Sequence, residues 1–198
     1  MSYPTPLTPD TMQKLMQTVT QTALGVSNTD YASVRVGWQQ QGQPAWGINE
    51  DVVILNAVED DDPYNRVRDQ KTALNDSASV ILLTTYTRVW RVMWTFYGPN
   101  SFDRARQLRS AMLATGVAPP AQTAHDVLAL SNVYLVTDLT APQRVPELYE
   151  KQWWERVDFS CQFNEFVTEA PIVPSVASAE IIVEDSSGVV ADIDVTVP

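Results

Sequence analysis

The feature that most constrains this chain is a run of alternating apolar and polar residues late in the sequence. Every second position is apolar apart from Glu155, and the apolar set is Trp153, Val157, Phe159, Cys161 and Phe163. The positions between them begin with Trp154 and Arg156 and continue with polar residues. Successive side chains of a strand point to opposite faces, so the run predicts a long strand. It places Trp153 towards the core, and Trp154 and Arg156 on the face left for a partner.

Two segments predict amphipathic helices. The first begins near Pro9 and ends at Gly25, with apolar residues at three- and four-residue intervals, and the second spans residues 102–115. Ser101 is the expected N-cap of the second helix. That helix also carries three arginines, Arg104, Arg106 and Arg109. They predict a solvated face with local ion pairs, and a grip on an acidic partner is the alternative.

Residues rich in β-branched and aromatic side chains predict the strands, which are expected at residues 32–38, 51–58, 80–85, 88–97 and 127–136. In the segment 88–97 one alternating set is fully apolar and forms the expected core face, Trp90, Val92, Trp94 and Phe96. Strands and helices follow one another without a regular repeat. The expected class is therefore α+β, with a mixed or antiparallel sheet flanked by two main helices.

The C-terminal part of the chain predicts a β-hairpin arm. Pro171 and Pro174 precede two short apolar runs, at residues 180–185 and 189–197, which are separated by Ser-Ser-Gly. We expect one domain over residues 1–170 and a separate arm over residues 171–198. A lone hairpin is marginally stable in water, so its apolar residues should bury against an adjacent subunit. Those residues are Ile181, Ile182, Val183, Ile193 and Val195.

Composition limits the classes of partner. The 198 residues carry a net charge of −11, which argues against nucleic-acid binding as the main task, although an acidic wall would let DNA slide past. No stretch approaches the roughly 20 apolar residues of a membrane span. The N-terminal sequence MSYPTPLTPD lacks a basic region followed by an apolar one, so we expect no signal peptide and synthesis in a cytoplasm.

Residue patterns for chemistry are weak throughout the sequence. His125 is the single histidine, and Cys161, the single cysteine, falls on the apolar side of the predicted strand. The acidic run at residues 59–62 is expected to be a solvated loop, with cation binding as the less favoured alternative. We therefore expect no enzyme activity, no cofactor and no metal.

Six tryptophans raise the alternative of a carbohydrate-binding module. They are Trp38, Trp46, Trp90, Trp94, Trp153 and Trp154. Aromatic rings stack on sugars, but they are also common in cores and at subunit interfaces. Core and subunit contact is the favoured interpretation.

Four sequence blocks resemble the bacteriophage neck-terminator family, which is related to tail terminators. They are Trp38-Gln39-Gln40 with Gly42-Gln43-Pro44, Tyr64-Asn65 with Arg68-Asp69, RVWRVMWTFYGPNSFDRA at residues 88–105 with Leu108-Arg109, and Arg144-Val145-Pro146-Glu147 with QWWERVD at residues 152–158. The likeness covers residues 34–184. These blocks resemble structural signatures rather than catalytic ones.

The resemblance implies a structural protein of the virion neck, assembled in the host cytoplasm. Such proteins form a ring, usually a hexamer, that ends the tail tube and joins it to the head-side connector. The implied partners are further copies of the chain, the tail tube protein and a head-completion or adaptor protein, with DNA only passing through. Another tail structural subunit, of the tube or an adaptor, is the main alternative to a terminator.

Overall fold

A computed structural model describes residues 5–30, 32–37, 45–76, 79–114, 123–174, 178–185 and 188–196. The chain divides into two compact units. The larger unit holds residues 6–67 and 87–167, and the smaller holds residues 1–5, 68–86 and 168–198. Among the described residues, no helix combines the length and the apolar character that a bilayer span requires.

The larger unit is built on a mixed sheet with the strand order β1-β2-β4-β9-β5. Its strands are β1 (Val34–Val36), β2 (Val52–Glu59), β4 (Ser79–Tyr97), β9 (Arg156–Glu169) and β5 (Val133–Leu135). β1 runs parallel to β2, whereas β2 runs antiparallel to β4. The two-residue strand β6 (Gln143–Arg144) pairs with β9. Together with β3 and β10 of the smaller unit, the described strands form an eight-stranded sheet, which confirms the predicted α+β class.

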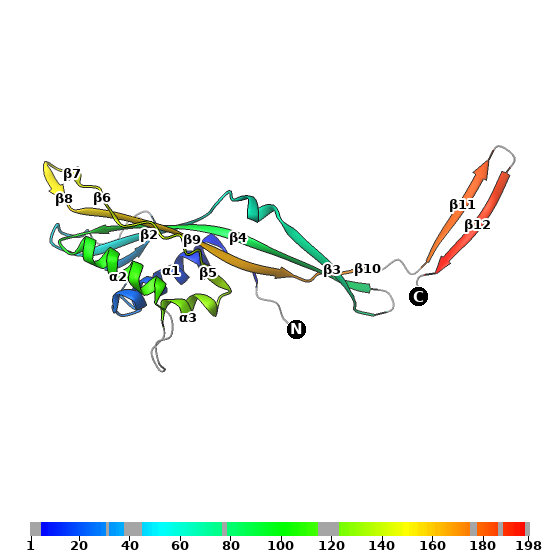
Figure 1. The fold of residues 1–198 in the computed structure, drawn as a ribbon, viewed down its shortest axis with the longest axis horizontal. Coiled ribbons are helices and arrows are strands. Elements are labelled where there is room, and N and C mark those ends of the chain that lie inside the picture. The colour runs from blue at the N-terminus through cyan, green and yellow to red at the C-terminus, as the bar shows by residue number, and fades with distance from the viewer. Residues whose placement is uncertain are drawn as a thin grey trace. The chain divides into compact units, whose positions relative to one another are not determined.

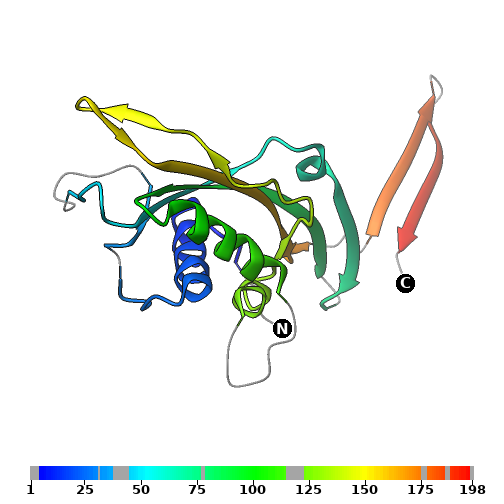
Figure 2. The ribbon, with the colours of Figure 1, turned by 60° about the vertical axis from the view of Figure 1, so that its left-hand side comes forward.

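Three helices of the larger unit lie on one face of its sheet (Figures 1 and 2). They are α1 (Pro9–Leu24), α2 (Ser101–Leu113) and α3 (Ala124–Ala129). The sequence sets both ends of α1: Thr8 and Thr11 form a capping box, and Gly25 ends the helix with a φ of 66°. The second helix is anchored differently, because Asp51 accepts hydrogen bonds from the backbone and side chain of Asn100 and from Arg104.

The core lies between these helices and the sheet. Trp90, Val92, Trp94 and Phe96 of β4 are fully buried, as the alternation predicts. Val157, Phe159, Cys161 and Phe163 of β9 are buried as well. Trp94 stacks on Phe159 at 5.5 Å between ring centroids, and its indole Nε1 donates to Thr20 of α1. An aromatic layer shared by β4 and β9 therefore holds α1 on the sheet.

Several predicted boundaries were wrong. The segments 80–85 and 88–97 form one continuous strand, β4, and Ser101 is the first residue of α2, with Asn100 as its N-cap. The predicted strand at 127–136 is instead the end of α3 followed by β5. The signal for α3 is a capping box, in which Thr123 and Asp126 bond to each other's backbone amides. Of the predicted strand at 32–38 the structure retains Val34–Val36, and Trp38 lies outside the described residues.

The smaller unit contains a three-stranded ribbon and a hairpin. β3 (Arg68–Leu74) and β10 (Ile172–Pro174) both pair antiparallel with the first half of β4. β11 (Ser178–Asp185) and β12 (Gly188–Thr196) form the predicted C-terminal hairpin, with an irregularity between Val183 and Glu184. The proposed boundary between residues 170 and 171 stays a prediction.

Candidate functional site

The sheet face opposite the helices carries the polar alternate residues of β4 and β9. Arg91 and Met93 of β4 are exposed, and Thr95 and Tyr97 are half-buried. Arg156 of β9 is half-buried on the same side, where it lines a hollow together with Thr95 and Tyr97. This face is therefore accessible to a partner.

A tight hairpin lies beside this face. β7 (Glu147–Tyr149) pairs with β8 (Gln152–Trp154), and Glu150 and Lys151 form the two-residue turn. Both turn residues have positive φ, 49° and 65°. That conformation is the one a two-residue hairpin requires and that Asn-Gly adopts most readily. The hairpin places Tyr149 and Trp154 next to each other, with ring centroids 6.2 Å apart.

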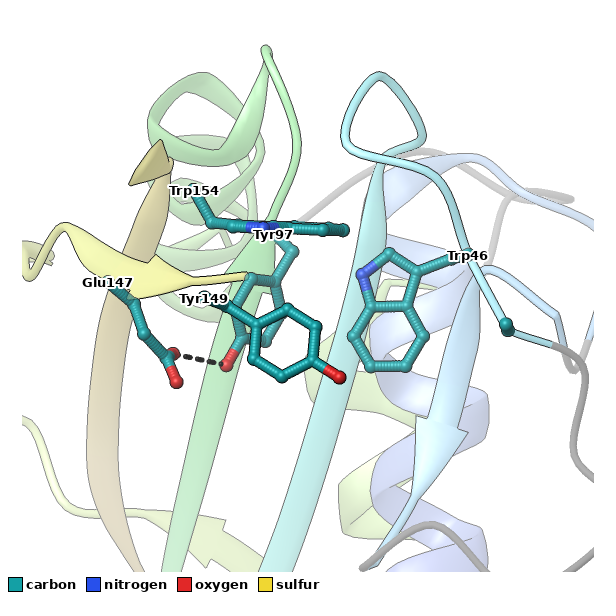
Figure 3. Close-up of a pocket in the computed structure, with 6 residues that line it drawn as sticks. Trp46, Tyr97, Glu147, Tyr149 and Trp154 are labelled. Carbon is teal, nitrogen blue, oxygen red and sulfur yellow. Dashed lines mark hydrogen bonds between the residues drawn. The ribbon is translucent and has the colours of Figure 1, made fainter. Parts of the chain in front are cut away.

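Six residues line the aromatic pocket, a hollow of about 340 Å³ that is open to solvent. They are Ala45, Trp46, Tyr97, Glu147, Tyr149 and Trp154. They come from the loop before β2, from the end of β4 and from the β7–β8 hairpin (Figure 3). The ring centroid of Tyr97 lies 5.6 Å from that of Trp46 and 6.5 Å from that of Trp154.

Two hydrogen-bond donors in the aromatic pocket have no partner among the residues that the structure describes. The indole Nε1 atoms of Trp46 and Trp154 are both buried, and neither has a hydrogen-bond partner among the described residues. Buried donors in native proteins are nearly always paired. These two N–H groups are therefore exceptions to that rule within the described part of the chain.

The carboxylate of Glu147 is already engaged. It accepts a 3.0 Å hydrogen bond from the Tyr97 hydroxyl and a 3.3 Å bond from Arg156. Burial, and then the hydrogen bond to Glu147, raise the pKa of Tyr97 to about 12. Two bonds of 2.9 Å to Asp158 are the main cause that raises the pKa of Arg156 above its usual value. Arg156 thus pairs with two carboxylates, Glu147 and Asp158, and the cluster keeps one net negative charge.

A second polar cluster lies in the core of the larger unit. Glu165 is 3% exposed, and its carboxylate accepts from the Leu7 backbone, from Trp90 Nε1 and from Arg88. Arg88 also bonds Glu59 and the carbonyl of Leu7. This cluster ties the segment before α1 to β4 and β9, so its role is structural.

The acidic run is exposed at Glu59 and Asp61 and half-buried at Asp60 and Asp62, and its side chains also make specific contacts. Glu59 pairs with Arg88, Asp60 with Arg91, and Asp61 with Arg66. Asp62 caps the short helix η1 (Pro63–Arg66). No group of three or more histidine, cysteine, aspartate or glutamate side chains in the described ranges is placed to hold a metal ion.

The predicted partner-facing residues have different outcomes. Trp154 lines the aromatic pocket, and Arg156 lies beside it. The prediction that Trp153 faces the core was wrong, because its side chain is 67% exposed. The apolar residues of the hairpin, Ile181, Ile182, Val183, Ile193 and Val195, lie in β11 and β12, whose backbone pairing alone is described.

His125 and Cys161, the two residues considered as catalytic candidates, lie in ordinary environments. His125 is exposed on α3. Cys161 is buried under the sheet, and desolvation raises the pKa of its thiol well above its usual value. An inert thiol is the expected consequence.

Sequence reasoning missed Tyr97, Glu147 and Tyr149 as pocket residues and counted Trp46 only among the tryptophans. The available signal was the mixture of apolar and polar residues between Pro146 and Trp154. The two-residue turn inside this segment contains neither Gly nor Asn. It also missed Glu165, a carboxylate that occupies the buried side of β9 between the apolar residues Phe163 and Val167.

A comparison with curated proteins gives no match. A comparison with protein families does: the family described as "Phage neck terminator protein" matches residues 10–189. The match spans both helical and strand segments of the larger unit, the whole of β11 and the first two residues of β12. The chain belongs to the phage neck terminator protein family.

Proposed function

We propose that this chain is a structural subunit of the virion neck that assembles into a closed ring, ends the tail tube and joins it to the head-side connector. The observation that carries the proposal is the family match over residues 10–189. A ring requires a head-to-tail interface, in which two different surfaces of the subunit meet. The chain offers surfaces of this kind in both of its units.

The ribbon of the smaller unit supports self-association. All seven residues of β3 are exposed, and Leu74 and Ile172 are 85% and 63% exposed. The paired half of β4, from Val80 to Thr87, is only half-buried. A small ribbon with this much open apolar surface gains stability when a neighbour covers it.

The C-terminal hairpin is a second candidate for the subunit interface. Its register pairs apolar residues with one another, Ile181 with Ile193 and Ala179 with Val195. It also pairs acidic residues, Glu180 with Asp194. The apolar residues Ile181, Ile182, Val183, Ile193 and Val195 are proposed to bury against the next copy.

The net charge of −11 per copy suits a channel for DNA. An acidic lumen repels the phosphate backbone, so DNA passes without adhering. Proposed partners are therefore further copies of this chain, the tail tube protein and a head-side adaptor protein.

The first test is the solution mass by light scattering on a sizing column, over a concentration series and with purified tail tube protein added. We expect a discrete ring, either alone or on addition of the tube protein. A strict monomer indifferent to the tube protein contradicts the proposal. Open-ended polymers would favour a tube subunit instead.

Variants then test the hairpin. Truncation after Pro174 keeps β10 and removes β11 and β12, and Ile181→Asp with Ile193→Asp places charge at one apolar pair. Both changes should convert rings to monomers. The matched control is Glu180→Gln with Asp194→Asn at the neighbouring acidic pair, which should leave the ring mass unchanged. Intact rings from the truncated chain would exclude the hairpin as the interface.

A further inference from the structure

We propose that β3 binds the β3 strand of a second copy of this chain. The two strands pair antiparallel about a two-fold axis at Gln70, so that Asp69 of each copy lies opposite Lys71 of the other. This contact goes beyond the proposed function, because it does not depend on the ring. It follows from the open edge of β3, from the direction of its backbone groups and from the order of its charges.

The outer edge of β3 (Arg68–Leu74) has no strand beside it in the part of the chain that the structure describes. There β3 pairs with β4 alone, from Arg68 opposite Tyr86 to Leu74 opposite Val80. All seven residues of β3 are exposed. An uncovered edge of this kind can take up a strand from another chain.

The backbone of β3 directs hydrogen-bonding groups at that edge. Thr72 lies opposite Leu82 of β4, and the Leu82 amide donates to Pro171, next to β10 on the other side of β4. The N–H and C=O of one residue in an antiparallel strand point to the same side, so Leu82 faces away from Thr72 and Thr72 faces outward. Gln70, two residues earlier, faces outward as well. Both residues can therefore bond an incoming strand.

The order of the charges on β3 is complementary to itself. Asp69 and Lys71 lie on one face of the strand, where they form a 3.6 Å ion pair within the copy. When Gln70 of one copy faces Gln70 of another, each Asp69 lies opposite a Lys71, and Arg68 lies opposite the neutral Thr72. Asp69 and Lys71 then occupy non-hydrogen-bonded positions, where facing side chains are closest. Opposite charges at facing positions stabilise a strand pair.

The neighbouring two-fold registers lack this match. With Lys71 on the axis all seven residues of β3 would pair, but two ammonium groups would face each other. With Asp69 on the axis two carboxylates would face each other. With Thr72 on the axis no ion pair forms across the strands. Like charges at facing positions are destabilising, so the charges of β3 select the register at Gln70.

A two-fold contact uses the same surface on both copies, so it joins them in pairs and cannot add a third. It therefore differs from the head-to-tail contact that a ring requires. Exposed ion pairs contribute little to affinity, so the charges choose the register and the main-chain hydrogen bonds hold the two strands together.

Cysteine cross-linking tests the register. Gln70→Cys should give a disulfide-linked dimer under mild oxidation, because Cα atoms of facing bonded residues lie about 5.5 Å apart, within the reach of a disulfide. Thr72→Cys is the matched control, since its two copies would lie four residues apart along the strands, about 13 Å, which no disulfide spans. The native Cys161 is buried and should not compete. Equal dimer yields from the two variants on a non-reducing gel would overturn the proposal.

Charge reversal tests the partner. Asp69→Lys places lysines opposite each other and Lys71→Asp places aspartates opposite each other, so each variant alone should associate about tenfold more weakly by sedimentation equilibrium. An equimolar mixture of the two variants should pair again, because lysines of one copy then face aspartates of the other. Asp61→Lys, which breaks an exposed ion pair outside β3, is the control and should associate as the parent does. A mixture that stays unpaired would overturn the proposal.

The mass separates this contact from the ring. With the two-fold contact, the parent should have twice the mass of Asp69→Lys, whether the unit that pairs is a monomer or a ring. Dimers without rings would support the β3 contact and contradict the proposed function. Rings whose Gln70→Cys variant gives no cross-link would support the proposed function and overturn the β3 contact.

Discussion

The indole Nε1 of Trp90 donates a 2.8 Å hydrogen bond to the carboxylate of Glu165, and both side chains are buried. The two residues lie on β4 and β9, the two long strands of the sheet. The same carboxylate accepts from Leu7, which precedes α1. One acidic side chain thus links three segments that are far apart in the sequence.

Replacing Glu165 should be costly. Glu165→Ala leaves the Trp90 indole and the Leu7 amide without an acceptor and removes one partner of Arg88, so we expect a loss of about 3–5 kcal/mol in the free energy of unfolding. Glu165→Gln retains one acceptor and should lose about 1–3 kcal/mol. Urea unfolding measures both, and Glu155→Gln, at an exposed position, is the control. Equal stability of Glu165→Ala and the control would contradict a structural role for the cluster.

Gly98 cannot accept a side chain. Its φ is 105°, and a Cβ atom there would lie 2.5 Å from the backbone oxygen of Glu50. Gly98→Ala should destabilise the protein by on the order of 3 kcal/mol, because strain and steric overlap act together. Gly47→Ala is the matched control, since its nearest neighbour is the Glu50 carboxylate at 3.8 Å and its φ is not positive. Thermal unfolding of the two variants should differ clearly.

The turn of the β7–β8 hairpin stores strain that can be removed. Glu150 and Lys151 both adopt positive φ, which costs about 1–2 kcal/mol for each residue with a side chain. The double change Glu150→Asn/Lys151→Gly should therefore stabilise the hairpin by about 1 kcal/mol or more. A rise in melting temperature checks this, with Glu155→Asn, outside the turn, as the control. A fall would show that the two original side chains have contacts that outweigh the strain.

Tyr97 makes alkaline stability depend on pH. Its pKa is raised from the ordinary 10.0 to about 12 in the folded protein, so folding favours the protonated phenol. The contribution to stability is complete below pH 10 and is lost as the pH rises from 10 towards 12. Because Tyr97 is only half-buried, the loss is smaller than the full shift implies.

Ultraviolet titration near 295 nm should show a late component that ionises near pH 12, and this component should vanish in Tyr97→Phe. Tyr134→Phe, at a residue on β5 that is 47% exposed, should leave it in place. A late component that persists in Tyr97→Phe would assign it to another tyrosine.

Sequence periodicity predicts burial correctly in the parts of the fold where another layer lies over the apolar face. The stripe of α1 and the apolar sides of β4 and β9 pack on one another, so their alternation predicts burial correctly. Trp153 shares the parity of Val157, yet it is exposed. Alternation assigns a side chain to a face, but burial also requires another layer over that face.

The aromatic pocket could not be predicted from periodicity, for a different reason. Tyr97 lies on the polar side of β4, as the alternation predicts, but Trp46 and Tyr149 reach it from segments about 50 residues away on either side. Only the strand register and the tight turn bring these rings together. Periodicity describes one element at a time and contains no such long-range information.

The charges of β3 bear on when the protein assembles. Arg68, Asp69 and Lys71 lie on a strand that pairs on one side with β4 and is exposed along its whole length. An open strand edge invites pairing with any other edge, and charged side chains discourage pairings in which like charges would meet. If copies assemble as proposed, these charges would protect a free copy from fibrous aggregation. Its incorporation would then depend on a complementary surface rather than on crowding.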